Sequence, residues 1–500
     1  MQSTDTLNKP PYGIIAILLI GAFISLLNET LLNVALPSIM KDLDVTTSTV
    51  QWLATGYMLV NGIMIPTTAF LIQRFTVRGL FLTAMSLFTV GTILAGMSPA
   101  FSVLLIARVI QASGAAIMMP LLMNVMLTSF PIEKRGSAMG IFGLVMIFAP
   151  AIGPTLSGWL IEHFDWRMLF HIVSPISFIV LIAAVFLLRD KKEKTPINLD
   201  FLSLVLSTIG FGGLLYGFSS AGDKGWDSPE VYGTIIVGVI GLVLFIVRQF
   251  KLEIPMLEFR IFRYPMFALS STISIVITMA LFSAMLLMPI YIQTIREISP
   301  LDSGLLMLPG ALMMGIMSPI TGKLFDKFGA RLLAVIGLTI TAITTYFFSQ
   351  LTLETTYTTL ITLYTVRMFG MSMVMMPIMT NGLNQLPAQF NPHATAMNNT
   401  LQQVSGAIGS ALLVTVMSNR TATHAEELAK NVISQGTIPT AEIQHQIGMQ
   451  AMVDGINDSF AVSVVLVIVA LILSLFVKRA RPAEVDDPRE EKAGNEQFAT

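Results

Sequence analysis

The chain has 500 residues, of which 54% are hydrophobic and only 12% are charged, and its formal net charge is −1. A soluble globular domain carries about 25% charged residues, so this composition excludes an ordinary soluble domain and a basic nucleic-acid-binding protein. It indicates an integral membrane protein. The sequence contains no cysteine, which excludes disulfides and thiolate metal sites.

Fourteen apolar segments follow one another along the chain, each close to the ~20 residues that a helix needs to cross a bilayer. The first is too long for the apolar core of a signal peptide, so we expect it to be retained as a helix. The fold class predicted is therefore an all-α integral membrane protein with 14 transmembrane helices. The predicted spans are 13–34, 50–72, 79–97, 101–126, 137–160, 168–188, 200–218, 231–250, 264–290, 303–321, 332–350, 359–380, 396–417 and 460–478.

Basic residues gather on one side of these spans when the N-terminus is placed in the cytoplasm. The inward loops then contain Arg74, Arg78, Lys134, Arg135, Arg189, Lys191, Lys192, Lys194, Arg248, Lys251, Arg260, Arg263, Lys323, Lys327 and Arg331. The outward loops contain only Lys41, Arg167, Lys224, Arg296, Arg420 and Lys430. Because cytoplasmic loops are enriched in Lys and Arg, we expect a multi-pass plasma-membrane protein with both termini in the cytoplasm.

Two copies of a basic turn indicate an internal repeat. AFLIQRFTVRG (69–79) follows the second span and GKLFDKFGAR (322–331) follows the tenth, and both lie in inward loops. Two bundles related by a repeat are the plan of a transporter that rocks around a central site. The strongly charged segment 189–200 is expected to join the two bundles.

Five patterns in the expected order resemble the major facilitator superfamily, and in particular its fourteen-helix drug:proton antiporter branch. They are the inward-loop signature with Gly322, Asp326, Lys327, Gly329 and Arg331; Leu104, Arg108, Gln111 and Gly114 in the fourth span; Gly153-Pro154 and Gly158 in the fifth; Asn33-x-Ala35-Leu36-Pro37 in the first; and Trp52, Tyr57 and Asp165-Trp166-Arg167. The resemblance implies the major facilitator fold, with two six-helix bundles and an inserted helix pair.

The domain boundaries expected from this resemblance cover the whole chain. They are a cytoplasmic N-terminus (1–12), an N-terminal six-helix bundle (13–188), a linker with two inserted transmembrane helices (189–263), a C-terminal six-helix bundle (264–478) with a polar extracellular loop (418–459), and a disordered cytoplasmic tail (479–500). Weak helical periodicity inside 418–459 predicts short surface helices there.

The sequence departs from the family pattern at three places. The branch usually has Asp where this chain has Asn28, and the acid comes one residue later, as Glu29. In the first inward loop Gln73, Thr76 and Val77 replace the expected Asp, Gly and Arg, which weakens the expectation that this copy latches a gate. In the fifth span Ser157 replaces a usual Gly.

Glu29 is the acidic residue that we place well inside a span. A charge at the centre of the bilayer costs roughly 2.5–3.5 kcal/mol, and intramembrane acids usually mark proton or substrate pathways. We expect Glu29 to carry the coupling proton and Arg108, in the fourth span, to tune it. Arg108 could instead only brace helices, and for Arg367 in the twelfth span bracing and substrate contact are equal alternatives.

Neutral polar residues within the spans are the substrate-binding candidates: Asn28, Asn33, Tyr57, Asn61, Gln111, Asn398 and Gln402. The gate candidates are Gly153, Pro154, Asp326 and Arg331. The Gly153-Pro154 pair either kinks a helix that merely packs or seals the cavity against proton leak. Amides with few charges suit a lipophilic or weakly cationic substrate better than a phosphate or a sugar.

The function predicted is export of lipophilic or cationic drugs by proton antiport through alternating access, that is, multidrug efflux. A dedicated proton-coupled exporter of one metabolite or lipid, and a non-transporting receptor on a transporter scaffold, remain alternatives. No phosphate-binding GxxxxGK[ST] pattern or metal-ligand spacing of histidines is present, so we expect no enzyme activity, no metal and no cofactor. The expected partners are small substrates, protons and membrane lipid, and the expected state is a monomer.

Overall fold

The computed structural model describes residues 12–188, 199–434 and 440–480, and these residues form helices and connecting turns without a β-strand. In chain order the elements are α1 (Tyr12–Asp42), α2 (Thr47–Arg74), α3 (Val77–Gly96), α4 (Phe101–Ser129), η1 (Ile132–Lys134), α5 (Arg135–His163), α6 (Met168–Leu187), α7 (Phe201–Lys224), α8 (Pro229–Lys251), η2 (Phe259–Arg263), α9 (Pro265–Ile290), η3 (Tyr291–Ile295), α10 (Pro300–Phe328), α11 (Ala330–Phe348), α12 (Tyr357–Ser372), α13 (Met375–Asn384), η4 (Ala388–Phe390), α14 (Asn391–Ser434) and α15 (Ala441–Ser474).

Fourteen helical segments of these described residues are long and apolar enough to cross a membrane, and each coincides with one of the predicted spans. The prediction of an all-α, fourteen-span protein is therefore confirmed. α12 and α13 share one span, from Tyr357 to Asn384. The predicted N-terminal segment (1–12), the charged linker (189–200) and the tail (479–500) lie outside the described residues except at 12, 199–200 and 479–480. Of the tail, Ala480 N donates a hydrogen bond to Asn381 Oδ1.

Threonine and serine begin several of the helices. Thr46, Thr76, Ser299, Thr356 and Thr440 each accept a hydrogen bond from a backbone N–H in the first turn that follows. Such caps satisfy amides that have no partner inside the helix. A threonine or serine between two apolar segments therefore fixes where the next helix begins.

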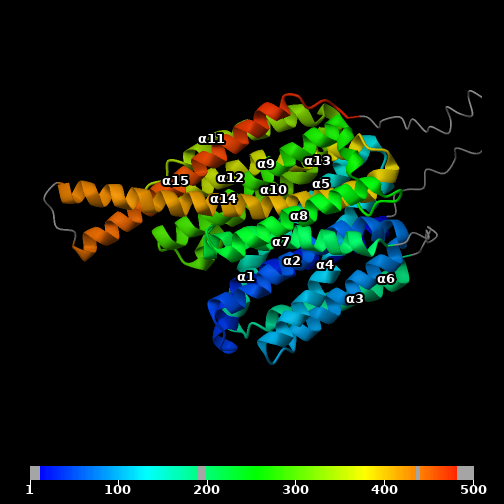
Figure 1. Cartoon of the computed structure of the whole chain (residues 1–500), viewed down its shortest axis with the longest axis horizontal. Coiled ribbons are helices and arrows are strands. Elements are labelled where there is room, and N and C mark those ends of the chain that lie inside the picture. The colour runs from blue at the N-terminus through cyan, green and yellow to red at the C-terminus, as the bar shows by residue number, and fades with distance from the viewer. Residues whose placement is uncertain (1–11, 189–198, 435–439, 481–500) are drawn as a thin grey trace, which may run out of the picture.

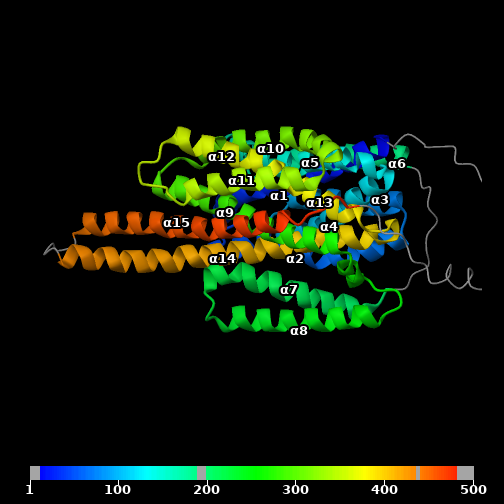
Figure 2. The ribbon, with the colours of Figure 1, turned by 90° about the horizontal axis from the view of Figure 1, so that it is seen from above.

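The helices form two bundles (Figure 1), and α7 and α8 lie apart from them as a pair on one side (Figure 2). α1 packs on α5 and α6 and α3 on α4 in the first bundle, while α9 packs on α14 and α15 and α11 on α12 and α15 in the second. α7 and α8 pack on each other, and α7 touches α2 of the first bundle and α14 of the second, as Figure 2 shows. The inserted pair therefore covers one seam between the bundles, and the other seam is formed by α5 and α10.

The prediction of a polar loop with short helices over 418–459 is wrong for the part of it that the structure describes. α14 continues without a break to Ser434 and α15 already begins at Ala441, so both helices extend beyond the other helices as a hairpin (Figure 1). Ion pairs of Arg420 with Asp458 and of Lys430 with Glu426 lie along it. The helical periodicity is weak because no described residue between 420 and 450 is buried, so this part of the hairpin needs no apolar stripe.

The α5–α10 seam is closed by very close backbone approach. A Cβ atom on Gly322 would lie 2.3 Å from the carbonyl oxygen of Gly136, and one on Gly140 would lie 2.6 Å from the carbonyl oxygen of Ser318. Ser318 Oγ also donates a hydrogen bond of 2.9 Å to Gly140 O. Small residues permit this approach, as at other helix contacts in membranes.

Candidate functional site

Arg108 on α4 is the centre of a buried polar network inside the first bundle, and its side chain is only 1% exposed. Its guanidinium donates to Asn28 Oδ1 of α1 at 3.0 Å and to Gln111 Oε1 at 2.6 Å. It also donates to Leu53 O of α2 at 3.4 Å and lies 4.0 Å from the centroid of the Tyr57 ring. Gln111 in turn donates to Thr92 Oγ1 of α3 at 2.7 Å. One cation thereby joins the first four helices.

Asn28, rather than Glu29, makes the direct contact with Arg108. Among the described residues Glu29 has neither a hydrogen bond nor an ion pair within 4 Å, and its side chain is partly exposed while Asn28 is buried. One residue on a helix is a rotation of about 100°, so the two neighbours point in different directions. Because Glu29 adjoins Asn28 in the chain, its carboxylate lies near the positive charge of the Arg108 guanidinium without pairing with it.

The residues after Glu29 hold α1 against α5. A Cβ atom on Gly153 would lie 2.2 Å from Thr30 Oγ1, so only glycine permits this contact. Ser157 Oγ donates a hydrogen bond of 2.6 Å to Leu31 O, and Ser157 is fully buried. The departure from the family glycine at position 157 therefore adds a bond between α1 and α5. Pro154 lies within α5, but its side chain is outside what the structure describes.

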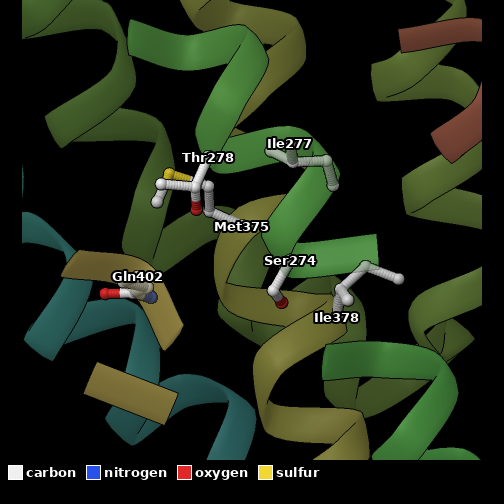
Figure 3. Close-up of a pocket in the computed structure, with 6 residues that line it drawn as sticks. All are labelled: Ser274, Ile277, Thr278, Met375, Ile378 and Gln402. Atoms are coloured by element: carbon white, nitrogen blue, oxygen red, sulfur yellow. The ribbon is translucent and has the colours of Figure 1, made fainter. Parts of the chain in front are cut away.

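Across the molecule, a small cavity of about 10 Å³ lies between α9, α13 and α14 (Figure 3). It is lined by Ser274, Ile277, Thr278, Met375, Ile378 and Gln402. The lining contains two hydroxyls, one amide and no charged group. A cavity of this volume has room for about one water molecule, whereas drug-sized ligands occupy roughly 300–1,000 Å³, so the bundles must separate here before a drug can enter.

Two of the predicted polar candidates lie on α14 beside this cavity. Asn398 Nδ2 contacts the sulfur of Met379 at 2.9 Å, and Gln402, which lines the cavity, contacts the same sulfur at 3.9 Å. Asn61 is buried one turn after Tyr57 on α2. The side chain of Asn33 is outside what the structure describes. The structure thus divides the candidates between an Arg108 network in the first bundle and a cavity in the second.

Arg367 is fully buried in the second bundle. It donates to Thr345 Oγ1 of α11 at 3.1 Å and to Ala280 O of α9 at 2.8 Å. In this conformation it braces α9, α11 and α12, and its place in the second bundle resembles that of Arg108 in the first.

At the end of the bundles that we predict to be cytoplasmic, Asp326 binds the first turn of α5. Its carboxylate accepts hydrogen bonds from Gly136 N and Ser137 N, both at 2.9 Å, and from Ser137 Oγ at 2.6 Å. A carboxylate is favourable at a helix N-terminus, where amide N–H groups lack internal partners. Arg331 is exposed at the start of α11, and the described residues place Arg479, rather than Arg331, on the backbone oxygen of Asp326, at 2.7 Å.

On the other seam the structure shows a contact that sequence reasoning did not identify. Gln73 Nε2 of α2 lies 3.0 Å from His393 Nε2 of α14. Gln73 stands at the position of the repeat that Asp326 occupies in the second copy. Aligning the two turns could have indicated a partner near the start of α14, because Asp326 binds the start of α5, but nothing in the sequence marks His393.

The family model of the Major Facilitator Superfamily matches residues 18–410. The chain belongs to this superfamily. It is 50% identical to the uncharacterised MFS-type transporter YcnB of Bacillus subtilis (strain 168), with 95% of this chain and 97% of that protein covered. It is 43% identical to the lincomycin resistance protein LmrB of the same organism, with 93% and 95% covered.

A solved member of the superfamily fold has a similar arrangement of helices. The crystal structure of the human organic anion transporter MFSD10 superimposes with a TM-score of 0.65 at 11% identity, covering 93% of this chain and 100% of that chain. The predicted major facilitator fold is confirmed. The superfamily and its fold are those of membrane transporters, which are generally not enzymes.

Proposed function

We propose that this protein is a proton-driven exporter of lipophilic or cationic drugs that works by alternating access. The observation that carries the proposal is the position of Glu29, a partly buried glutamate of α1 between the Arg108 network and the Gly153 contact of α1 with α5. Similarity to LmrB over nearly the full chain supports drugs as the class of substrate. Both termini are proposed to be cytoplasmic, and no cofactor is required.

Glu29 binds a proton when the cavity faces the side of higher proton concentration. Neutralising the carboxylate removes its attraction to Arg108, and Arg108 then remains held by Asn28, Gln111 and Leu53 O. The next residue of α1, Thr30, contacts Gly153, so a change at Glu29 is transmitted directly to the packing of α1 on α5. The proton is released when the cavity faces the other side.

The substrate lies between the two bundles, with the cavity of Figure 3 as its contact on the second bundle. Ser274, Thr278 and Gln402 offer hydrogen bonds, and Met375 offers an adaptable thioether surface. No charged group lines this cavity, so we attribute the preference for a cationic substrate to Glu29 in the first bundle. A lipophilic cation or a neutral compound suits a site formed by this cavity on one side and Glu29 on the other.

The test is drug accumulation in proteoliposomes with an imposed pH gradient, for Glu29→Gln and for Glu162→Gln as a matched control. Glu162 is exposed near the outer end of α5, so the same substitution there leaves the proposed site intact. Lincomycin heads a panel that also contains lipophilic cations and neutral compounds. For exchange of one proton against a monovalent cation, one pH unit supports about tenfold accumulation.

The wild type and Glu162→Gln are expected to accumulate the drug and to acidify the opposite compartment. Glu29→Gln is expected to bind substrate but to show no uphill transport. Full pH-driven accumulation by Glu29→Gln would place the proton site elsewhere. Transport of a single member of the panel would favour a dedicated exporter over multidrug efflux.

A further inference from the structure

His393 joins three parts of the molecule at the inner end, defined as the end that carries the turns 69–79 and 322–331. It is the third residue of α14 and is 6% exposed. The backbone N–H of Glu258, in the segment that follows α8, donates to His393 Nδ1 at 3.2 Å. The Gln73 side chain of α2 meets Nε2 of the same ring. One imidazole therefore contacts both bundles and the end of the inserted pair.

These contacts determine the protonation of the ring. A backbone N–H can only donate, so the Glu258 N–H requires a lone pair on Nδ1. Gln73 Nε2 also donates to Ala69 O at 3.1 Å, which directs the NH₂ end of the carboxamide toward His393 Nε2. Both ring nitrogens therefore face donors, and a neutral ring can accept from one of them whereas a histidinium can accept from neither. A histidinium donates at both nitrogens, so its Nδ1–H would face the N–H of Glu258. The junction therefore needs a neutral imidazole.

A chain of hydrogen bonds connects this junction to the inserted pair. Gln249 of α8 is buried, and its Oε1 accepts from Met256 N at 2.7 Å and from Leu257 N at 3.2 Å, immediately before Glu258. Gln249 Nε2 donates to Ser203 Oγ of α7 at 2.6 Å. Because each hydrogen bond orients the next, protonation of His393 would weaken the hydrogen bonds that Gln249 makes with α7 and with the segment after α8.

Two charged side chains near the junction make contacts of their own. Arg74 at the end of α2 lies over the Phe70 and Phe75 rings, and the Glu258 carboxylate accepts from Arg260 N at 3.0 Å. α9, α13 and η4 contain no Asp, Glu, Lys or Arg, and the one charged residue of α4 is Arg108. His393 is the titratable side chain in the first turns of α14.

A further ion pair lies at the base of the inserted pair. Asp200, directly before α7, binds Arg248 of α8 through both carboxylate oxygens. The other charged residues of α7, Asp223 and Lys224, are at its opposite end. The Asp200–Arg248 pair therefore closes the inner end of α7 and α8 without contacting the imidazole.

We propose that His393 is a pH-sensitive junction, which in its neutral form closes the α2–α14 seam and ties the inserted helix pair to it, and which on protonation releases both. The α5–α10 seam, held by Asp326, does not respond. The inference deepens the proposed function, since acidification of the cytoplasm would then favour opening of one seam toward it. The junction itself can be measured without substrate or gradient.

Because this chain contains no cysteine, a spin label attaches only to cysteines that are introduced by substitution. Spin labels at Phe75→Cys and Gln389→Cys, both exposed positions, report the α2–α14 seam of the full-length protein in nanodiscs. Labels at the exposed positions Glu133→Cys and Lys327→Cys report the α5–α10 seam as a matched control. Distances between labels are measured by double electron–electron resonance from about pH 8 to about pH 5, which brackets the ordinary pKa of histidine.

In acid the α2–α14 pair is expected to gain a longer-distance population, with the open-to-closed ratio rising up to about tenfold per pH unit. The control pair is expected to stay unchanged. His393→Gln, which cannot titrate, should abolish the response, and Gln73→Leu should show the longer distance already at high pH. An equal response of both pairs, a response that persists in His393→Gln, or no response of the wild type would overturn the proposal. None of these outcomes depends on whether Glu29 couples protons.

Discussion

The two inner turns, 69–79 and 322–331, occupy equivalent places in the two bundles but are built differently. Gly329 ends α10 with a φ of 80°, in the left-handed region that favours glycine. At the equivalent position Thr76 has a φ of −75°, and its hydroxyl caps α3 by accepting from Gly79 N at 3.1 Å. The turn 69–79 is therefore capped by a side chain, whereas the turn 322–331 relies on glycine, so the two turns differ in type.

The same difference extends to what each turn binds. Asp326 supplies a charged acceptor for three donors at the start of α5, whereas Gln73 meets a neutral imidazole near the start of α14. Hydrogen bonds to charged groups are worth about 1.5–3 kcal/mol, and those between neutral groups about 1 kcal/mol. At equivalent positions of the repeat, Asp326 thus gives a stronger α5–α10 seam, and Gln73 gives a weaker α2–α14 seam whose histidine can be protonated.

The largest expected effect is that of Asp326→Asn. The amide keeps the shape and one acceptor oxygen, but it places an NH₂ donor against the N–H of either Gly136 or Ser137 and removes the charge, so the closed α5–α10 seam should lose about 2–3 kcal/mol. We expect the transport rate to fall roughly 30-fold or more, measured in proteoliposomes. The equivalent Gln73→Ala should fall much less, and equal effects would show that the charged turn is not the stronger one.

Gly322→Ala tests the backbone approach on the same seam. The added Cβ would lie 2.3 Å from Gly136 O, and a backbone atom cannot move aside as a side chain can. Overpacking of this kind costs about 2 kcal/mol, which corresponds to a roughly 30-fold shift away from the closed seam. Gly233→Ala on α8, where nothing lies within 4 Å of the new Cβ, is the control. The labels at Glu133→Cys and Lys327→Cys would report the shift, and a distance that matches the control would contradict it.

Gln73→Ala should have a smaller effect, on the other seam. Loss of a neutral hydrogen bond to His393 costs about 1 kcal/mol, so the closed α2–α14 population should fall about fivefold. The α5–α10 distance should stay as in the wild type. If both seams loosened together, the two turns would act as one unit and the comparison between them would fail.

The smallest effect is expected for Asp200→Asn at the base of the inserted pair. Hydrogen bonds from the Arg248 guanidinium hold the pKa of the Asp200 carboxyl well below its usual range, and Ser203 contributes in the same direction. A lowered folded-state pKa gives stability that is present above the ordinary value of about 3.9 and is lost only as the pH falls through the lower folded value.

The loss on substitution should therefore be the same at all pH values between about 5 and 8. The pair is partly exposed, so we expect the unfolding free energy to fall by less than about 1 kcal/mol, measured as a thermal midpoint at several pH values. A loss that grew toward pH 5 would assign to Asp200 the acid response that we attribute to His393. Arg260→Gln, which removes a more exposed guanidinium at 4.0 Å from Glu258, is the control.

The sequence alone determined the fourteen spans and the family, because the apolar length of a span and the composition of its motifs are local properties of the chain. Arg108 and Asp326 were also found this way, since each lies in a motif of fixed spacing. The extension of α14 and α15 over 418–459 was not, because an exposed helical hairpin carries no apolar stripe for the periodicity to show.

Only the tertiary structure decided which side chains meet. Asn28, rather than its neighbour Glu29, faces Arg108, because the rotation of α1 is set by its packing on α5 through Thr30 and Ser157. Gln73 and His393 are 320 residues apart, and nothing local in either segment signals the other. Contacts of this kind depend on how two bundles and an inserted pair pack together, which is a property of the whole chain and not of any stretch of it.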